Sequence, residues 1–233
     1  MKIYIDHPKL RKRAFFSHAA SLGGFFLLMA GIVMPLFLPG LAGVSRAIVF
    51  VGILVSMSGI YFANRWVRRP RPEDSLAEAL KNLGDDYSLY NYTSLRGKHI
   101  LLMPNGVMAL ETINLAGEFS YLNGRWKEKM NLGRMFRYLL EEHLGDPTRN
   151  ARQAVEDLKT QIRNLEGVTK AVPVLGTVVF LHPLAQLEAK SAPVPVCKVD
   201  KLRKMVVTKA PKLDPEVYEQ ISAFLEKCTV DQQ

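Results

Sequence analysis

The sequence predicts a two-helix transmembrane hairpin followed by an α/β domain with a mixed central sheet. Two observations lead to this prediction. Two long runs near the start hold no Asp, Glu, Lys or Arg, and the chain after residue 72 alternates amphipathic helical patterns with short, β-rich apolar runs. The 233 residues suffice for one ordinary domain and an appendage. We therefore divide the chain into a basic N-terminus (1–13), the hairpin (14–66), a basic Pro-rich linker (67–72) and the domain (73–233).

The two apolar runs have the length and composition of membrane spans. Residues 19–38 are about long enough to cross a hydrocarbon layer of ~30 Å at ~1.5 Å per residue, and residues 47–63 form the second span. A signal peptide has a shorter apolar region and no second run directly after it. Neither span shows a polar face or contains Asp, Glu or Lys, so we interpret the pair as an anchor. Small residues predict close packing between the spans: Gly23, Gly24, Gly31, Gly52, Ser56 and Gly59.

The formal net charge of +9 lies entirely in the first third of the chain. Residues 1–72 hold 10 Lys and Arg and one acidic residue, whereas residues 73–233 hold 21 residues of each sign. Basic flanks on both sides of the hairpin predict an integral membrane protein with its N-terminus and its C-terminal domain in the cytoplasm. The zero net charge of the domain predicts only weak binding of nucleic acid, although a local basic patch remains compatible with it.

Hydrophobic periodicity and turn residues mark the elements of the domain in order. Pro70 and Pro72 stiffen the linker, and Asn123-Gly124 is a strong signal for a hairpin turn. Asp214, followed by Pro215, predicts the start of the last helix. The predicted helices are 73–83, 131–144, 147–165 and 214–227. The predicted strands are 87–92, 100–102, 107–111, one within 117–126 that includes the Asn123-Gly124 turn, 172–181 and 194–199.

The centre of the domain is a predicted β-hairpin over residues 98–117. Its turn is Pro104-Asn105-Gly106, in which Pro presets φ while Asn and Gly tolerate positive φ. The second strand ends on Glu111, which is either a solvated strand-end residue or a placed catalytic group. Together with Gly117, this stretch resembles the central motif of the nuclease-related domain (NERD) family, relatives of the PD-(D/E)xK endonucleases.

Two further motifs extend the resemblance. Glu73 falls where the family's first helix has its Glu, and Asp146-Pro147-Thr148-Arg149-Asn150 is similar to the family's Asn-Pro-x-x-Gln, with both amide positions altered. The resemblance covers roughly residues 73–181. It implies a restriction-endonuclease-like αβββαβ core, with Pro147 and Asn150 as structural motif residues.

The resemblance also implies an active site in which an Asp, the Glu and a Lys hold Mg²⁺ and stabilise charge on a phosphate. In this chain Lys98 stands at the Asp position and Ile113 at the Lys position. The degenerate candidate site is therefore Glu111, Lys98 and Glu73, with Glu111 as the one candidate metal ligand. In one interpretation, Lys98 replaces the missing Lys, and Asp85 or Asp86 supplies a metal ligand. The reading that we favour has a Lys98–Glu111 ion pair in place of the metal.

Other chemistries find less support in the sequence. The five histidines form no metal-ligand pair at helical spacing, and we interpret His99 as a sheet residue. There is no Gly-rich phosphate loop and no nucleophile elbow. Cys197 and Cys228 match neither a metal spacing nor a disulfide framework, and the basic stretch Lys201–Lys209 is interpreted as a solvated face.

We therefore expect a membrane-anchored, cytoplasmic NERD-like domain that has lost nuclease activity and serves in binding or scaffolding. No cofactor is expected, and the lipid bilayer is the one partner that the sequence assigns. The first alternative is a metal-dependent nuclease that uses Mg²⁺ and a relocated lysine on DNA or RNA. The second is a structural membrane protein that only forms homo-oligomers.

Overall fold

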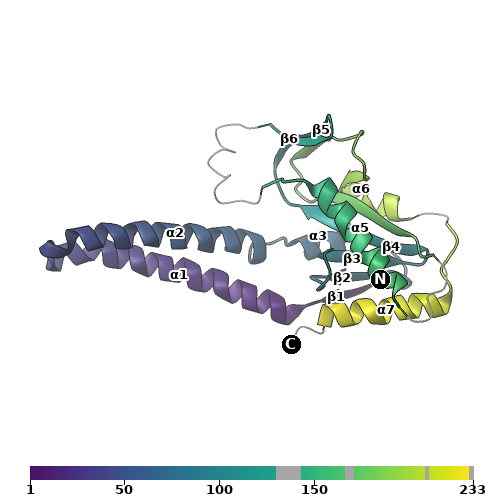
Figure 1. The fold of residues 1–233 in the computed structure, drawn as a ribbon, viewed down its shortest axis with the longest axis horizontal. Helices are drawn as coiled ribbons and strands as arrows, with labels where there is room; N and C mark the ends of the chain where they lie inside the picture. Colours follow the sequence, from purple (N-terminus) through teal and green to yellow (C-terminus); the bar gives the residue numbers. More distant parts are fainter. Residues whose placement is uncertain (130–142, 166–170, 208–209, 231–233) are drawn as a thin grey trace. The chain divides into compact units, whose positions relative to one another are not determined.

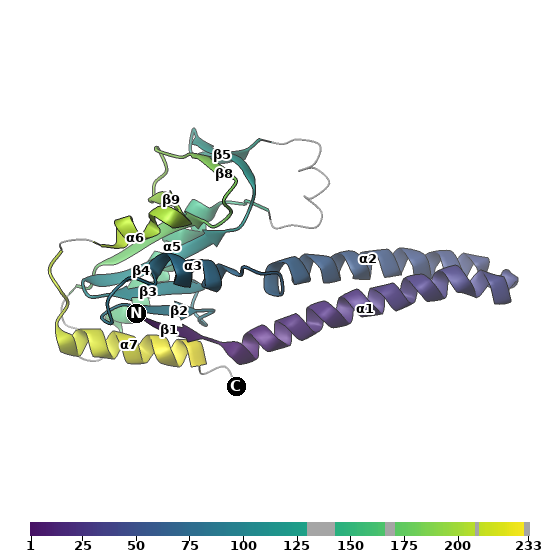
Figure 2. The ribbon, with the colours of Figure 1, turned by 180° about the vertical axis from the view of Figure 1, so that it is seen from behind.

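The computed structural model describes residues 1–129, 143–165, 171–207 and 210–230 (Figures 1 and 2). The chain divides into two compact units. One is a helical unit built from residues 7–71, and the other is an α/β unit that combines residues 1–6 with most of the chain after residue 72. The predicted helix over 131–144 falls almost entirely on residues outside the described ranges.

The helical unit is an antiparallel pair of long helices, α1 (His7–Phe37) and α2 (Ala42–Trp66), joined by the short 3₁₀ helix η1 (Pro39–Leu41). Both are long and apolar enough to cross a membrane. At one end of the pair the Arg13 guanidinium lies 4.0 Å from the centre of the Trp66 ring, which ties the start of α1 to the end of α2.

Small residues form the contact between α1 and α2. A Cβ atom added to Gly24 would lie 2.6 Å from the Ser56 backbone nitrogen, and one added to Gly59 would lie 2.5 Å from the Ser21 backbone nitrogen. The Ser45 hydroxyl donates a hydrogen bond of 2.5 Å to the Gly31 carbonyl oxygen. The predicted close packing is confirmed for these glycines, and for Gly52 against Leu28, whereas a Cβ at Gly23 would meet nothing within 4 Å.

The α/β unit contains a six-stranded mixed sheet in the order β1-β2-β3-β4-β7-β9. Strands β2, β3 and β4 form an antiparallel meander, while β1, β7 and β9 each run parallel to their neighbour. A second sheet has the order β6-β5-β8. The bounds are β1 Lys2–Ile5, β2 Ser88–Asn91, β3 His99–Met103, β4 Gly106–Ile113, β5 Gly117–Leu122, β6 Arg125–Glu128, β7 Val174–Phe180, β8 Ala185–Glu188 and β9 Val196–Lys198.

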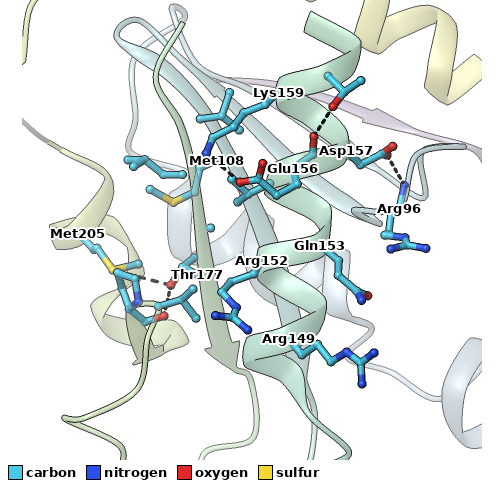
Figure 3. A pocket seen from close by; sticks show the side chains of 17 residues that line it. Arg96, Met108, Arg149, Arg152, Gln153, Glu156, Asp157, Lys159, Thr177 and Met205 are labelled. Carbon is cyan, nitrogen blue, oxygen red and sulfur yellow. Dashed lines mark hydrogen bonds and ion pairs between the residues drawn. The ribbon is translucent and has the colours of Figure 1, made fainter. Parts of the chain in front are cut away.

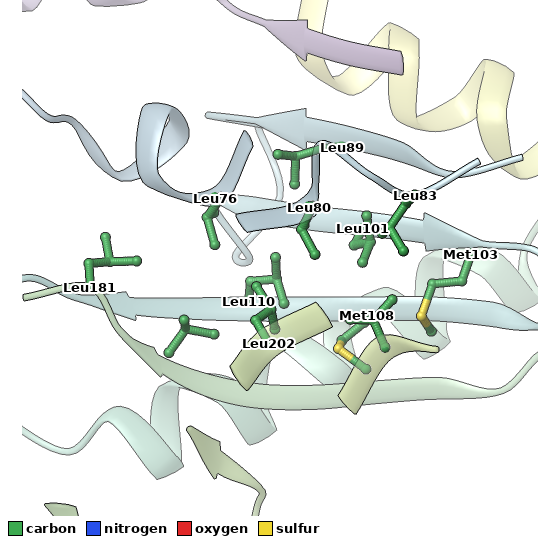
Figure 4. Packing of buried hydrophobic residues seen from close by; sticks show 12 residues of the cluster. Leu76, Leu80, Leu83, Leu89, Leu101, Met103, Met108, Leu110, Leu181 and Leu202 are labelled. Atoms are coloured by element: carbon green, nitrogen blue, oxygen red, sulfur yellow. The ribbon is translucent and has the colours of Figure 1, made fainter. Parts of the chain in front are cut away.

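Helices cover both faces of the six-stranded sheet (Figure 1). On one face, α3 (Pro72–Leu80) and α6 (Val199–Val206) bury leucines against β2, β3 and β4 (Figure 4). On the other face, α5 (Pro147–Arg163) and α7 (Pro215–Val230) enclose a second core around Tyr90, Ile100 and Leu102. The central strands are therefore apolar on both sides, as the continuous apolar runs in the sequence require.

The predicted central hairpin is confirmed as β3 and β4, paired from His99–Leu110 to Met103–Gly106. Gly106 adopts φ +154°, and a Cβ there would lie 2.4 Å from the Pro173 carbonyl oxygen, so glycine is needed both for the turn and for the approach of the neighbouring chain. The second predicted turn is also present, because Asn123 and Gly124 have φ values of 51° and 77° between β5 and β6.

Strands β1 and β8 and helix α6 were not among the predicted elements. Strand β1 precedes the two-helix hairpin and pairs with β2, so the α/β unit includes residues 1–6 in addition to residues 72–129 and the described residues from 144 onward. Helix α6 overlaps the basic stretch Lys201–Lys209. Its basic residues Lys201, Arg203 and Lys204 are exposed, in agreement with the predicted solvated face, while Leu202 and Val206 are buried on its other face.

Candidate functional site

Glu111 and Asn150, which come from two separate motifs of the sequence, meet in the structure. Glu111 lies on β4 on the same face as Val107 and Ala109, the face that α5 covers. The Asn150 side-chain amide in the first turn of α5 donates a hydrogen bond of 2.9 Å to Glu111 Oε1. The prediction that the strand ends on Glu111 is wrong, because β4 continues to Ile113 and pairs with β7 there. The contact therefore connects the last third of a central strand to the start of the helix that packs over it.

The start of α5 is fixed by a local cap. The Asp146 carboxylate accepts hydrogen bonds from the Thr148 hydroxyl at 2.6 Å and from the Arg149 backbone N–H at 3.0 Å. Burial alone would raise the pKa of Asp146, but these two hydrogen bonds, with the nearby guanidinium groups, hold it below its ordinary value. Pro147 occupies the first helical position, so the motif residues of the sequence have a capping role that positions Asn150.

Lys98 directly precedes β3, the strand that pairs with the strand of Glu111. His99 pairs with Leu110, so continuing the antiparallel register by one residue places Lys98 opposite Glu111 and on the same face of the sheet. Its side chain is exposed. The register therefore brings Lys98, Glu111 and Asn150 to the same end of the interior strands β3 and β4.

Glu73 belongs to a different environment. It is almost fully buried on α3, on the opposite face of the sheet from Glu111, and Oε2 accepts a hydrogen bond from the Tyr92 hydroxyl. The Tyr92 ring meets His99 edge-on at 5.2 Å, and His99 Nδ1 lies 2.8 Å from Asn91 Oδ1. Glu73 is thus part of a buried polar cluster that includes Tyr92, His99 and Asn91, and it does not share a surface with Glu111.

His99 is a neutral structural group in this cluster. Burial, and to a smaller extent the charge of Lys98, lowers the pKa of His99 to about 3. Asn91 Nδ2 donates to the Tyr4 carbonyl oxygen at 3.3 Å, which turns Asn91 Oδ1 toward the imidazole. His99 Nδ1 must therefore carry the proton and donate it, so the ring links β2 to β3 in a fixed tautomer.

The relocated-lysine arrangement lacks its expected carboxylates. Asp85 and Asp86 precede the first residue of β2, whereas Asn91 at the other end of β2 pairs with His99. At ~3.3 Å per strand residue, this places them roughly 15 Å from the Lys98 end of the sheet. Asp86 Oδ2 instead contacts Lys212 Nζ at 3.3 Å.

Ile113, which the resemblance in the sequence sets at a lysine position, packs in the core. It is 7% exposed and packs in a cluster with Phe119 and Phe180. Gly117, four residues later, begins β5 with φ +144°. Within the described ranges, no group of three or more His, Cys, Asp or Glu side chains is arranged to hold a metal ion.

A second candidate site, which was not predicted from the sequence, is a groove of about 1100 Å³ beside α5 and β7 (Figure 3). Its walls come from the outer face of α5, the first half of β7, residues 194–195 and Met205. The charged lining residues are Arg96, Arg149, Arg152, Glu156, Asp157 and Lys159. The basic residues of α5 were the one available signal in the sequence, but their grouping along a strand edge depends on the tertiary fold.

Comparison with known protein families, with curated proteins and with solved structures gives no match for this chain. The resemblance to the NERD family therefore stays a prediction that rests on the sequence motifs.

Proposed function

We propose that this chain is a membrane-anchored binding or scaffolding protein whose α/β unit is a NERD-like domain without nuclease activity. The proposal rests on the groups that surround the Glu111 carboxylate. This carboxylate accepts a hydrogen bond from the Asn150 amide at 2.9 Å, and Lys98, directly before β3, stands at the position that the resemblance assigns to a metal-binding Asp.

Metal-assisted phosphodiester cleavage needs hard oxygen ligands and a cation placed to stabilise the attacked phosphate. A lysine beside Glu111 opposes a divalent cation, because two like charges about 4 Å apart repel by several kcal/mol at an effective dielectric constant of about 20. Ile113 cannot donate a hydrogen bond, and its place in the core supports a structural role for that position. In this proposal the groups needed for cleavage are replaced, and binding is the role left to the α/β unit.

The connection of the hairpin to the sheet supports an anchor with both ends on one side of the membrane. Strand β1 precedes α1 and pairs in parallel with β2, which follows α2. A chain that crosses the membrane between two paired strands must cross an even number of times. With Lys and Arg concentrated at both outer flanks, the positive-inside rule assigns that side to the cytoplasm.

A cleavage assay of the full-length chain in detergent micelles tests the proposal. We expect no cutting of duplex DNA or RNA with Mg²⁺ or Mn²⁺, and the same result for Glu111→Ala. Cutting by the unmodified chain that needs a divalent ion and is abolished by Glu111→Ala would establish the nuclease with a relocated lysine instead.

Two restoring variants sharpen the assay. Lys98→Asp alone and Lys98→Asp with Ile113→Lys return the carboxylate and the lysine that the family uses. Because Ile113 is buried, thermal unfolding of the double variant is measured first, and Lys98→Asp serves as the variant with an intact core. Metal-dependent cleavage gained by a folded restored variant supports both the family resemblance and the loss of activity.

A further inference from the structure

The first half of strand β7 has a neighbour on one side only. Strand β4 pairs with β7 along its whole length, from Val174 to Phe180. On the other side β9 pairs only with Val178, Val179 and Phe180. Among the described residues, no strand pairs with the stretch from Val174 to Thr177 on that side, which leaves a sheet edge four residues long.

The register shows which backbone groups point toward this edge. The Val107 N–H donates to the Pro173 carbonyl at the start of the β4–β7 ladder, and the Leu181 N–H donates to the Ile113 carbonyl at its end. In a parallel ladder these bonds come from alternate residues, so the backbone N–H and C=O groups of Leu175 and Thr177 also point toward β4. The N–H and C=O groups of Val174 and Gly176 therefore point away from β4, just as the Val178 N–H reaches the Pro195 carbonyl at 3.0 Å.

The groove described above runs along this edge. Val174, Leu175, Gly176 and Thr177 all line it, with residues 194–195 at the end where β9 begins. Figure 3 shows Arg152 and Lys159 on the side of α5 toward β7, and Met205 near Thr177 on the opposite side of the strand. The Thr177 hydroxyl contacts Met205 Sδ at 3.8 Å and donates to the Pro195 carbonyl at 3.0 Å. Side chains thus flank the edge on two sides. Solvent reaches its middle, where Leu175 is 49% exposed and Gly176 is partly exposed, whereas the side chains of Val174 and Thr177 are buried.

The charge of the groove is locally positive in a domain of zero net charge. Four basic and two acidic residues line it. Both acidic side chains are engaged, since Glu156 contacts Lys159 Nζ at 2.9 Å and Asp157 accepts from the Arg96 backbone N–H at 3.2 Å. Arg149 and Arg152 lie near Asp146, whose pKa their charges help to lower. Both also line the groove, where their guanidinium groups offer donors to an anionic ligand.

We propose that an extended acidic peptide segment of a partner protein binds here by adding a strand to the edge of β7 at Val174–Thr177. Only a polypeptide backbone offers alternating donors and acceptors that match Val174 and Gly176, and acidic side chains match Arg149 and Arg152. This deepens, and rests on, the proposed binding role, because it names the class of partner for the α/β unit.

Fluorescence anisotropy with the full-length chain in micelles tests the site. The probe is a fluorescein-labelled peptide, Glu-Val-Glu-Val-Glu-Val-Glu, and two comparison peptides replace every Glu by Lys or every Val by Pro. We expect saturable, micromolar binding of the first peptide only. The Lys peptide lacks the charge match, and the Pro peptide lacks backbone donors for a ladder.

Two pairs of variants locate the binding. Val174→Pro removes one N–H that faces the edge, and Val174→Ala is its control because it loses a similar side chain but keeps the N–H. We expect binding to weaken about 5-fold in the Pro variant relative to the Ala variant, the usual size for one lost hydrogen bond. Arg149→Gln with Arg152→Gln is expected to weaken binding about 10-fold at low salt, while Lys201→Gln with Lys204→Gln on α6 leaves it unchanged.

The remaining outcomes overturn the proposal. Absence of saturable binding of the Glu-Val peptide, or equal binding by Val174→Pro and Val174→Ala, removes the added strand. If the Lys peptide binds as tightly as the Glu-Val peptide, the proposed charge complementarity is wrong. Binding of short single-stranded DNA in place of the peptide, lost in the double arginine variant, assigns the groove to phosphate. None of these results involves cleavage, so the edge proposal can fail while the proposal of a domain without nuclease activity stands.

Discussion

The two units of this protein distribute their side chains in opposite ways. In the helical unit the buried positions of α1 are Leu10 and the small residues Ser17, Gly24 and Gly31, spaced by seven. The large apolar side chains of the same helix, among them Phe15, Phe16, Phe25 and Phe26, are exposed. In the α/β unit the large apolar residues fill the core, as Tyr90, Leu102 and Phe180 do.

The difference indicates that the two units fold in different surroundings, the α/β unit in water and the helical unit in lipid. In water, burial of large apolar side chains drives folding, so they collect between sheet and helices. In a lipid bilayer the surroundings are as apolar as leucine, so helices associate through close van der Waals contact between small residues while large apolar side chains face the lipid. The same chain therefore uses glycine and serine for packing in one unit and leucine and phenylalanine in the other.

The largest expected effect contrasts Leu102→Ala with Phe25→Ala. Leu102 is fully buried between β3 and the α5–α7 layer, so its truncation should lower the free energy of unfolding by about 2–5 kcal/mol. Phe25 is exposed, and its truncation should leave the stability of both units unchanged. Urea unfolding in micelles, followed by Trp126 fluorescence in a Trp66→Phe background, measures this. Equal losses in both variants would remove the distinction between the two units.

The packing of the hairpin predicts a contrast between two glycines. Gly59→Ala places a methyl group 2.5 Å from the Ser21 backbone nitrogen and should cost about 1–3 kcal/mol of helix association. Gly23→Ala meets no atom within 4 Å and should cost nothing. Unfolding by SDS, followed by Trp66 fluorescence in a Trp126→Phe background, gives both values. A stable Gly59→Ala hairpin would show that the two helices do not pack at this distance.

The buried histidine predicts a pH dependence confined to the α/β unit. The pKa of His99 falls to about 3 on folding from an ordinary value of 6.5, mainly through burial, so between these values the unfolded chain binds a proton that the folded chain does not. The free energy of unfolding should therefore fall as the pH drops from 6.5, by up to about 1.4 kcal/mol per pH unit. Urea midpoints between these pH values test this, with His99→Gln as the variant that should lose the slope. An unchanged slope in that variant would assign the pH dependence to other groups.

The smallest effect concerns strand β1, which belongs to the α/β unit although it precedes the hairpin. Tyr4 stacks on Tyr90 with ring centres 4.7 Å apart, so Tyr4→Leu should lose about 0.5–1.5 kcal/mol of domain stability. Ile3→Ala, at a position 45% exposed, should change stability by less than about 0.5 kcal/mol. The free energy of unfolding of the α/β unit, followed by Trp126 fluorescence, distinguishes the two variants. Two neutral substitutions would mean that β1 adds little to the sheet.

Local chemistry explains which elements the sequence could predict. The β3–β4 hairpin follows from Pro104-Asn105-Gly106 between apolar runs, and the β5–β6 turn follows from Asn123-Gly124, because each signal lies within a few residues. Strand β1 carries no such signal. It is four residues long, sits in a basic segment, and pairs with residues more than eighty positions away.

In the candidate site too, local sequence could predict some features, and the others depend on tertiary packing. Glu111 was predicted from its place at a strand end and from its motif, yet its contact with Asn150 depends on how α5 packs across β4. The environment of Glu73 could not be predicted, because the sequence does not show on which face of the sheet its helix lies. The groove along β7 exists because β9 is only three residues long and leaves Val174–Thr177 open, which no local pattern reveals.

Cysteine accessibility in intact cells tests most directly the claim that a lipid-embedded hairpin separates two strands of one cytoplasmic sheet. The native Cys197 and Cys228 are replaced by Ser, and single cysteines are introduced as Ala42→Cys between the spans, Lys2→Cys in β1 and Lys201→Cys in α6. We expect an impermeant thiol reagent to label Ala42→Cys in intact cells and the other two only after lysis. Labelling of Ala42→Cys only after lysis, or labelling of Lys2→Cys and Lys201→Cys on different sides, would contradict this topology.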